Sequence, residues 1–317
     1  MKFPVFDLHC DTAYVLLGED FSQRISLRRN RCHVDLERAS VLPGYAQCFA
    51  CFTCPSDMLP TAISPERLFQ LEYEHILSEI HENSDRIRIA RSAAEIENNL
   101  HAGFMSAILT IEGPAGFGYD SGRLELLREM GFLLTTLGWN EANCLAGSHV
   151  TGGGLTEQGR SYVKKAQALG MLIDVSHISD EAFWDIMEIT EKPVIASHSN
   201  SRSVHHVSRN LTDEMFRAIC DADGVCGINL YTEFLGPSAD LDTVCDHIFH
   251  FMELDPSGKH ISLGGDLDGC DSIPDGFAGV QSYSALVQRL ICRGLPEDIV
   301  YQIFWKNALG VIERCCT

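Results

Sequence analysis

Short apolar runs recur along this chain and are separated by longer segments with helical periodicity. The apolar runs occupy residues 5–8, 45–53, 106–111, 132–137, 171–175, 193–196, 224–230 and 260–264. Several of them are apolar at nearly every position, which is typical of strands buried on both faces of a parallel sheet. Eight strands that alternate with helices over about 300 residues predict an α/β fold, and a closed (β/α)8 TIM-like barrel rather than an open sheet.

Helix signals fill most of the intervals between these strands. We expect helices at 65–83, 92–101, 121–130, 156–169, 180–190, 212–222, 240–253, 282–293 and 296–314. The sequence Ser64-Pro65-Glu66 combines an N-cap serine, a proline in the first turn and an acidic residue near the positive end of the helix dipole. No change in composition marks a boundary, so residues 1–317 are expected to form one domain.

The composition is that of a globular protein with acidic character. Of its 317 residues, 45% are hydrophobic and 21% are charged, and the formal net charge is −20. That charge opposes binding to nucleic acid and to anionic membranes. The first strand begins too close to Met1 for a secretory signal, and no apolar run reaches the roughly 18 residues of a membrane span. We therefore expect a cytoplasmic protein.

Thirteen cysteines are spread along the chain. An odd number without a compact spacing pattern indicates reduced thiols rather than a disulfide framework. Cys48, Cys51 and Cys54 have a spacing that suggests a zinc site, but they fall in or beside the strand at 45–53. Residues three apart on a strand face opposite sides, so we interpret these three as small core residues.

Metal-binding side chains stand where several predicted strands end. His9 and Asp11 follow the first strand, and residues two apart on a strand project from the same side. The other candidates follow four further strands and are Glu112, His177, His198 and Asp266. In a (β/α)8 barrel the C-terminal strand ends converge on the active-site face. We therefore expect these six side chains to lie together.

This ligand set has a definite chemical character. Imidazole nitrogen and carboxylate oxygen without cysteine suit Zn²⁺, and also Mn²⁺ or Co²⁺. One carboxylate can bridge two metal ions about 3.5–4 Å apart, and the metal lowers the pKa of bound water to about 7. The set thus indicates metal-assisted hydrolysis. His33 and Asp35 repeat the histidine–x–aspartate pattern, but they precede a short helix, so Asp35 is interpreted as its N-cap.

Several blocks in a fixed order carry a family resemblance over nearly the whole chain. They lie at residues 7–12, 111–113, 170–177, 193–200, 208–213 and 264–269. On these blocks the chain resembles the membrane (renal) dipeptidase family, peptidase family M19, and in particular its shorter bacterial, non-secreted members. The resemblance implies a zinc-dependent dipeptidase with two metal ions per subunit.

The resemblance also implies roles for individual residues. His9 and Asp11 would hold one zinc ion, His177 and His198 the second, and Glu112 would bridge them. A hydroxide between the two metal ions would attack the peptide carbonyl. Asp266 would carry the proton from the water to the leaving amine. Two substrate-binding residues are implied as well: Arg209 for the C-terminal carboxylate, which a guanidinium binds bidentately, and Tyr231 in the pocket wall.

One position departs from the renal pattern. Where those members have a substrate-binding histidine after the fourth strand, this chain has Trp139, followed by Asn140. An indole offers one N–H donor and a large apolar face, but it cannot carry a proton as imidazole does. Trp139 is therefore expected to bind substrate in a different way and to alter the pocket. His149, in the glycine-rich loop that follows, could compensate, but we interpret it as a solvent-exposed loop residue.

The preferred hypothesis is a cytoplasmic dinuclear zinc dipeptidase that cleaves free dipeptides, including those with a C-terminal D-residue. Its partners would be small dipeptides, with no nucleic acid or membrane, and the family implies a homodimer. One alternative is a barrel amidohydrolase or deaminase acting on another small amide. Such enzymes usually have His-x-His on the first strand and often a bridging lysine. A second alternative is a metal-binding homologue that has lost catalysis, which the presence of Asp266 and Arg209 opposes.

Overall fold

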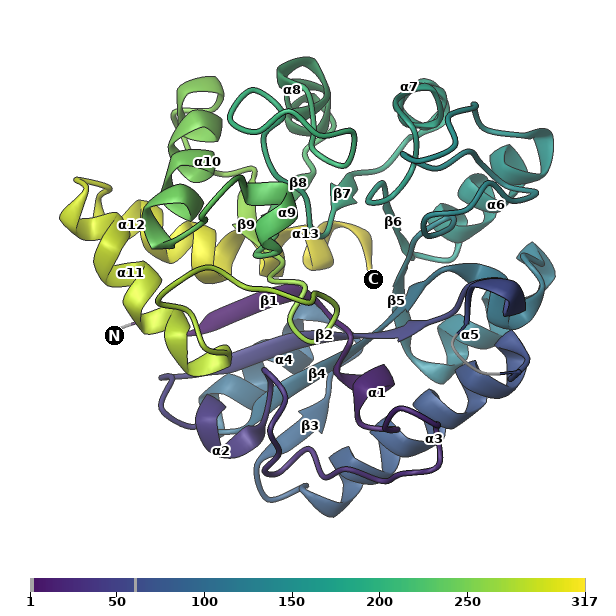
Figure 1. The fold of residues 1–317 in the computed structure, drawn as a ribbon, viewed down its shortest axis with the longest axis horizontal. Coiled ribbons are helices and arrows are strands. Elements are labelled where there is room, and N and C mark those ends of the chain that lie inside the picture. The colour runs from purple at the N-terminus through teal and green to yellow at the C-terminus, as the bar shows by residue number, and fades with distance from the viewer. Residues whose placement is uncertain (1–2, 60–61, 317) are drawn as a thin grey trace.

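A closed ring of parallel strands forms the centre of the molecule (Figure 1). The computed structural model describes residues 3–59 and 62–316. Its strands are β1 (Val5–Cys10), β2 (Tyr45–Phe52), β3 (Ile87–Ile89), β4 (Met105–Glu112), β5 (Phe132–Thr135), β6 (Leu172–Asp174), β7 (Val194–Ala196), β8 (Val225–Ile228) and β9 (Ile261–Leu263). The ring runs in the order β2-β1-β9-β8-β7-β6-β5-β4 and closes through parallel pairing of β2 with β4. The predicted (β/α)8 barrel is confirmed.

The short strand β3 lies outside the eight-stranded ring. It pairs in parallel with the start of β4, from Met105 to Ala107, whereas β5 pairs with the later residues Leu109–Ile111. The two strands therefore follow one another along β4. The hydropathy pattern did not identify β3 as a strand because it has only three residues and its central Arg88 is exposed.

Helices lie between the strands and cover the outside of the ring (Figure 1). They are α1 (Thr12–Val15), α2 (Leu36–Ala39), α3 (Pro65–Glu82), α4 (Ala93–His101), α5 (Leu124–Met130), α6 (Glu157–Ala168), α7 (Asp180–Ile189), α8 (Asp213–Asp221), α9 (Thr232–Leu235), α10 (Leu241–Leu254), α11 (Tyr283–Cys292), α12 (Glu297–Tyr301) and α13 (Asn307–Cys315). Asp35 accepts a hydrogen bond from the backbone N–H of Arg38 and caps α2, as predicted. Hydroxyl caps at Ser64, Ser179 and Thr212 fix the starts of α3, α7 and α8.

The last predicted helix is not continuous. A π-helical segment (Gln302–Lys306) lies between α12 and α13. Its buried Trp305 packs against Phe6 of β1, with ring centroids 5.9 Å apart. An extra residue in a helical turn changes the direction of the side chains that follow it. The apolar pattern of 296–314 could not show this change because it is set by the fit against the barrel.

Side chains from the strands and the C-terminal segment form one apolar cluster at the base of the barrel. It joins Phe6 and Leu8 of β1 to Trp305 and Ile312, together with apolar residues of five or more other strands. α13 contacts β1, β8 and β9. Buried apolar contacts of this kind supply most of the favourable free energy of folding. This cluster leaves the opposite end of the barrel, at the C-termini of the strands, available for a functional site.

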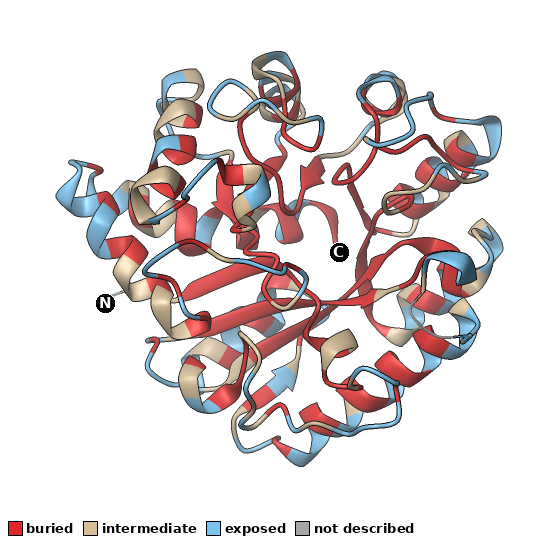
Figure 2. Cartoon of the chain, viewed as in Figure 1, coloured by how far each residue is buried: buried red, intermediate tan, exposed pale blue. Residues whose placement is uncertain are grey.

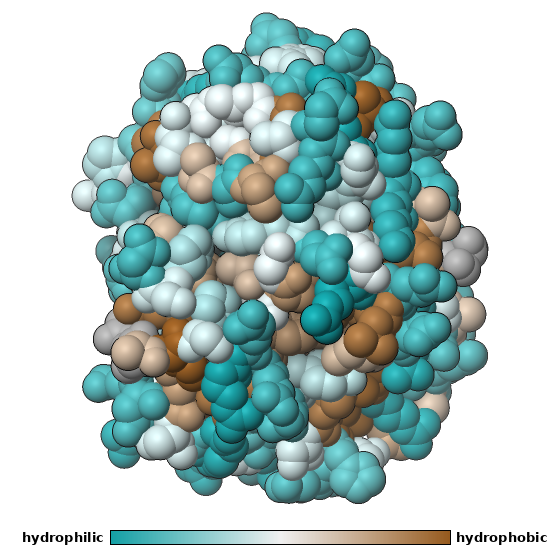
Figure 3. All heavy atoms as spheres, turned by 90° about the vertical axis from the view of Figure 1, so that its right-hand side faces the viewer, coloured by the Kyte–Doolittle hydropathy of each residue, from teal (hydrophilic) through white to brown (hydrophobic). Residues whose placement is uncertain are grey.

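Buried residues lie mainly in the barrel, and exposed residues lie mainly on the surface around it. Figure 2 shows the strands of the ring buried along most of their length, with exposure concentrated on the outer faces of the helices and in loops. All thirteen cysteines are free thiols, and Cys48, Cys51 and Cys54 are buried, which confirms their interpretation as small buried residues. One face of the molecule is largely hydrophilic with small hydrophobic patches between polar side chains (Figure 3). Within 3–59 and 62–316, no helix is long and apolar enough to cross a membrane.

Candidate metal centre and adjoining cavity

The five predicted metal ligands and the predicted catalytic residue Asp266 meet at the C-terminal end of the barrel. His9 and Asp11 come from the end of β1, and Glu112 is the last residue of β4. The other three stand in the loops after β6, β7 and β9 and are His177, His198 and Asp266. All six are buried, with exposed fractions of 8% or less. The expectation that these strand ends converge is confirmed.

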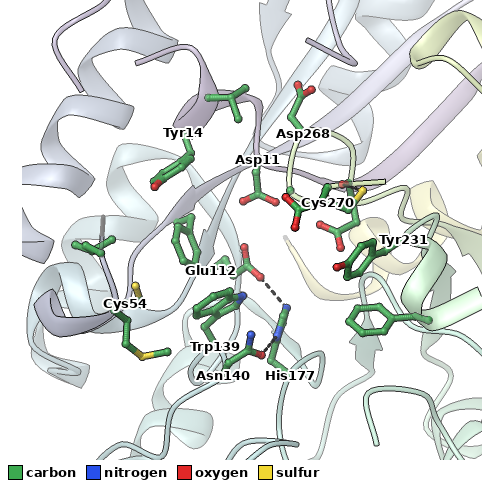
Figure 4. Close-up of a pocket in the computed structure, with 18 residues that line it drawn as sticks. Asp11, Tyr14, Cys54, Glu112, Trp139, Asn140, His177, Tyr231, Asp268 and Cys270 are labelled. Carbon is green, nitrogen blue, oxygen red and sulfur yellow. Dashed lines mark hydrogen bonds and ion pairs between the residues drawn. The ribbon is translucent and has the colours of Figure 1, made fainter. Parts of the chain in front are cut away.

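The Glu112 carboxylate lies between two groups of ligand atoms. Its Oε2 is 3.3 Å from His9 Nε2, which in turn is 3.3 Å from Asp11 Oδ2 and 3.8 Å from Asp266 Oδ1. Its Oε1 is 2.8 Å from His177 Nε2 and 3.7 Å from His198 Nε2. Figure 4 shows Glu112 between Asp11 and His177. Each oxygen of this carboxylate therefore faces its own set of ligands.

Neighbouring side chains fix the protonation of two of the histidines. The Ser197 hydroxyl donates to Asp174, so its oxygen accepts from His198 Nδ1 at 2.6 Å. The Nδ1 of His177 lies 3.1 Å from the side-chain oxygen of Asn140, which can only accept. Both rings therefore carry their hydrogen on Nδ1 and present the lone pair of Nε2. Metal-ligating histidines are commonly oriented by such a hydrogen bond on the second nitrogen.

His177 Nε2 and His198 Nε2 face each other, and neither carries a hydrogen. His177 Nε2 and His198 Nε2 are 2.9 Å apart, and both face Glu112 Oε1. Burial lowers the pKa of both histidines well below the usual value, and the charges of Arg209 and His9 add to this effect. The neutral rings and the carboxylate oxygen are thus three acceptors that face one another, and their repulsion is relieved by a cation bound among them.

The other side of Glu112 is rich in negative charge. Burial lowers the pKa of His9, but the Glu112 and Asp11 carboxylates outweigh this and raise it well above the usual value. Burial and the nearby Glu112 charge raise the pKa of Asp11 to about 6, and burial raises that of Asp266 to about 7. Asp11 Oδ1 is buried and has no hydrogen-bond partner among the residues that the structure describes. This donor set, with an orphaned oxygen and crowded carboxylates, fits a divalent metal ion.

Local backbone features aim these side chains at the barrel axis. A bulge between Asp7 and Cys10 places one extra residue in β1, so Leu8 faces the base of the barrel while His9 reaches the ligand cluster. His177 and Asp266 have left-handed backbone angles, with φ of 70° and 54°. Such angles cost on the order of 1 kcal/mol for a residue with a Cβ. They are common at functional sites, where surrounding contacts maintain them.

A glycine allows the backbone after β9 to approach the cluster. A Cβ on Gly269 would lie 2.0 Å from Asp11 Oδ2 and 2.5 Å from Asp266 Oδ1. Asp7, beneath the cluster, accepts hydrogen bonds from the backbone N–H groups of His9 and Gly265, each at 3.0 Å. It thereby holds the ends of β1 and β9 together. The roles of Asp7 and Gly269 could not be predicted from the sequence, since they depend on contacts between distant segments.

Two histidines outside the ligand set contact residues beside the site, and one of them, His149, differs from its predicted surroundings. His149 is half-buried rather than solvent-exposed, with Nε2 2.9 Å from Asn140 Oδ1 and Nδ1 3.1 Å from Ser208 Oγ. Burial, with the charges of Arg209 and Arg202, lowers its pKa to about 4. The exposed-loop interpretation was therefore wrong, because the loop folds back over the strand end after β6. His33 also reaches the site: its backbone N–H donates to Asp268 Oδ1 at 2.5 Å.

A cavity of about 360 Å³ opens above the ligands. Asp11, Glu112, His177 and Asp266 line its floor, and the predicted substrate residues Trp139 and Tyr231 are in its wall (Figure 4). Arg209 is not part of this lining but shares a small neighbouring cavity with His177. It is buried, donates one hydrogen bond to Ser199 Oγ at 2.8 Å, and has no partner at Nε or Nη2 among the described residues.

A (β/α)8 barrel whose strand ends gather three histidines and three carboxylates has the architecture of a metal-dependent hydrolase. The family model of membrane dipeptidases (peptidase family M19) matches residues 1–316. The chain belongs to this family, and it is a peptide-bond hydrolase of the metallopeptidase class.

Known relatives agree with this assignment. An uncharacterised dipeptidase of Schizosaccharomyces pombe is 29% identical over 330 aligned positions, covering 98% of this chain and 80% of the relative. A metallo peptidase from Rhodobacter sphaeroides, solved with a phosphinate mimic of the dipeptide L-Ala-D-Ala, is 27% identical with a TM-score of 0.89. The dipeptidase AC, a metallo peptidase of family M19, is 28% identical with a TM-score of 0.89. Both structural matches cover 99% of each chain.

The contact between Asn140 and His177 yields a first prediction. Asn140→Ala removes the acceptor that holds the hydrogen on His177 Nδ1, so we expect zinc affinity to fall roughly 10–100-fold. Competition with a chromogenic chelator would measure the affinity. Asn98→Ala, on the exposed face of α4, is the matched control and should bind zinc as the unaltered protein does. Unchanged affinity in Asn140→Ala would show that this hydrogen bond does not orient a ligand.

Proposed function

We propose that residues 1–317 form a single-domain dinuclear zinc dipeptidase that hydrolyses free dipeptides, including those with a C-terminal D-residue. His9 and Asp11 would hold one zinc ion, His177 and His198 the other, and Glu112 would bridge them. Mn²⁺ or Co²⁺ could replace zinc with the same ligand types. A cytoplasmic location and a homodimer remain predictions from the sequence.

The observation that carries this proposal is the arrangement around Glu112. One oxygen faces His9, and the other faces two neutral histidines whose lone pairs point at it. One ion beside His177 and His198 would relieve the repulsion among the acceptors there, and a second beside His9 and Asp11 would neutralise the crowded carboxylates. Two ions that share one carboxylate satisfy both requirements.

Metal ions held here would polarise the scissile carbonyl and lower the pKa of a water molecule into the neutral range. Asp266 is then suited to proton transfer. Its Oδ2 accepts a hydrogen bond from Asn229 Nδ2 at 3.0 Å, which leaves Oδ1 directed at the ligand cluster. A carboxyl whose pKa is raised to about 7 exchanges protons readily near neutral pH. We assign to Asp266 the transfer of a proton to the leaving amine.

Arg209 would bind the C-terminal carboxylate of the substrate. Its Nε and Nη2 are buried and have no partner within residues 3–59 and 62–316, although a buried guanidinium ordinarily has its donors satisfied. These two N–H groups lie on the same edge of the guanidinium and match the two oxygens of a carboxylate. Ser199 holds the third nitrogen in place. The cavity of about 360 Å³ is consistent with a small substrate.

Cleavage of dipeptides with a C-terminal D-residue is supported by the relative from Rhodobacter sphaeroides, which was solved with a mimic of L-Ala-D-Ala.

Two alternative functions predict different results in an activity assay. A barrel amidohydrolase or deaminase would act on a cyclic amide or nucleobase and not on dipeptides. A homologue without catalysis would bind zinc and release no amino acids from any substrate. Incubating the zinc-loaded protein with L,L and L,D dipeptides and following amino-acid release separates the proposed function from both alternatives, since only the proposed function gives turnover.

The role of Asp266 can be tested by substitution. Asp266→Asn keeps the size and the hydrogen-bond partner of the side chain but removes its ability to exchange a proton. We expect kcat to fall about 10²–10⁴-fold while the zinc content, measured by mass spectrometry, stays the same. Asp298→Asn, an exposed carboxylate on α12, is the control. Turnover by Asp266→Asn at the rate of the unaltered enzyme would exclude the assigned role.

The role of Arg209 predicts a change in substrate binding. Arg209→Lys retains the charge but loses the two parallel N–H donors. A charged hydrogen bond contributes about 1.5–3 kcal/mol, so we expect KM for a dipeptide to rise by roughly 10–100-fold. A dipeptide amide lacks the carboxylate and serves as the control substrate. The assignment fails if Arg209→Lys binds the dipeptide as tightly as before, or if it impairs the amide to the same degree.

A further inference from the structure

Three aromatic residues form a continuous wall on one side of the cavity. We call Tyr14, Phe52 and Trp139 the aromatic wall. The ring centroids of Tyr14 and Phe52 are 5.5 Å apart, and their planes make an angle of 82°. The ring centroids of Phe52 and Trp139 are 5.1 Å apart, with an interplanar angle of 75°. All three line the cavity and are only partly buried. Figure 4 shows Tyr14 and Trp139 on the same side of Glu112, opposite Tyr231.

The wall is not explained by the metal ligands or by the core. Core aromatic residues of this barrel, such as Phe6 and Phe132, are fully buried. The aromatic wall instead presents ring surface to the cavity. Phe21 packs against Tyr14, with ring centroids 5.3 Å apart. Trp139 has no hydrogen-bond partner for its indole N–H within the described part of the chain. A preformed apolar surface of this kind beside polar groups is typical of a ligand subsite.

The strand order places Phe52, the central residue of the wall, across the ring from the substrate anchor. Phe52 ends β2, and Arg209 lies in the segment after β7. In the order β2-β1-β9-β8-β7-β6-β5-β4, β2 and β7 are four strands apart in either direction. They are therefore opposite one another in a ring of eight. A dipeptide anchored at Arg209 would cross the ligand cluster and direct its N-terminal residue to the side where Phe52 lies.

We infer that the aromatic wall is the subsite for the side chain of the N-terminal residue, and that it selects a large apolar side chain such as leucine, methionine or phenylalanine. This inference rests on the proposed dipeptidase function. Charge on the rest of the lining favours the same class of substrate. Asp268 and Asp271 also line the cavity, and Asp271 is exposed. These carboxylates repel an acidic side chain and attract the substrate ammonium group.

The test compares dipeptides that differ only at the N-terminal residue. Leu-Ala, Phe-Ala, Gly-Ala and Glu-Ala would be offered to the zinc-loaded enzyme, and kcat/KM determined for each. Contact of a large apolar side chain with the wall should favour Leu-Ala over Gly-Ala by about 10–100-fold. Glu-Ala should be the poorest substrate. Equal values for the four dipeptides, or a preference for Glu-Ala, would overturn the inference while leaving the dipeptidase function intact.

Phe52→Ala removes the central ring of the wall. Its preference for Leu-Ala over Gly-Ala should fall to within about threefold. Phe249→Ala, a partly buried phenylalanine of α10 beside Arg293, is the matched control and should keep the full preference. An undiminished preference in Phe52→Ala would assign the selectivity to another part of the cavity and overturn the inference.

Tyr14→Ala provides a second variant if Phe52→Ala does not fold. Tyr14 lies on the four-residue helix α1 at the edge of the cavity, so its loss should disturb the barrel less. We expect the same direction of change, with a smaller loss of preference. An unchanged preference in Tyr14→Ala would contradict the assignment of the aromatic wall as this subsite. If the unaltered enzyme hydrolyses none of the dipeptides, the proposed function fails, and the subsite assignment fails with it.

Discussion

The Glu112 carboxylate is the group on which the site depends. It is buried between His9 on one side and His177 and His198 on the other. Neither His177 Nε2 nor His198 Nε2 carries a hydrogen, because each ring holds its hydrogen on Nδ1. A buried arrangement of mutually facing acceptors is unfavourable unless positive charge is bound among them. The need for cations thus follows from the hydrogen bonds that Asn140 and Ser197 impose on the two histidines.

The rest of the fold supports this unfavourable cluster. The apolar contacts at the base of the barrel anchor the strands, and the strands carry left-handed residues and a bulge at their other ends. Asp7 links the ends of β1 and β9 through backbone N–H groups. The functional end can therefore hold strained angles and crowded carboxylates that would destabilise an isolated loop. Arg209 and Phe52 then follow strands on opposite sides of the ring, so the polar and aromatic parts of the site are separated across the ligand cluster.

The barrel and the meeting of six polar side chains at its C-terminal end could be predicted because both follow from local patterns. An apolar run marks a strand, and a polar residue after the run marks its C-terminal end. The features that were missed depend on contacts between distant segments. The half-buried position of His149, the hydrogen bond from His177 to Asn140 and the π-helical segment near Trp305 are examples. The sequence showed Trp139 at a strand end, but only the structure placed it beside Phe52.

The most direct test of the two-metal centre is a crystal structure of the zinc-loaded enzyme with an anomalous difference map at the zinc edge. We expect two peaks per chain, one at each oxygen of Glu112. The first should be coordinated by His9 and Asp11, and the second by His177 and His198. A single peak, or two peaks that do not share Glu112, would contradict the two-metal centre.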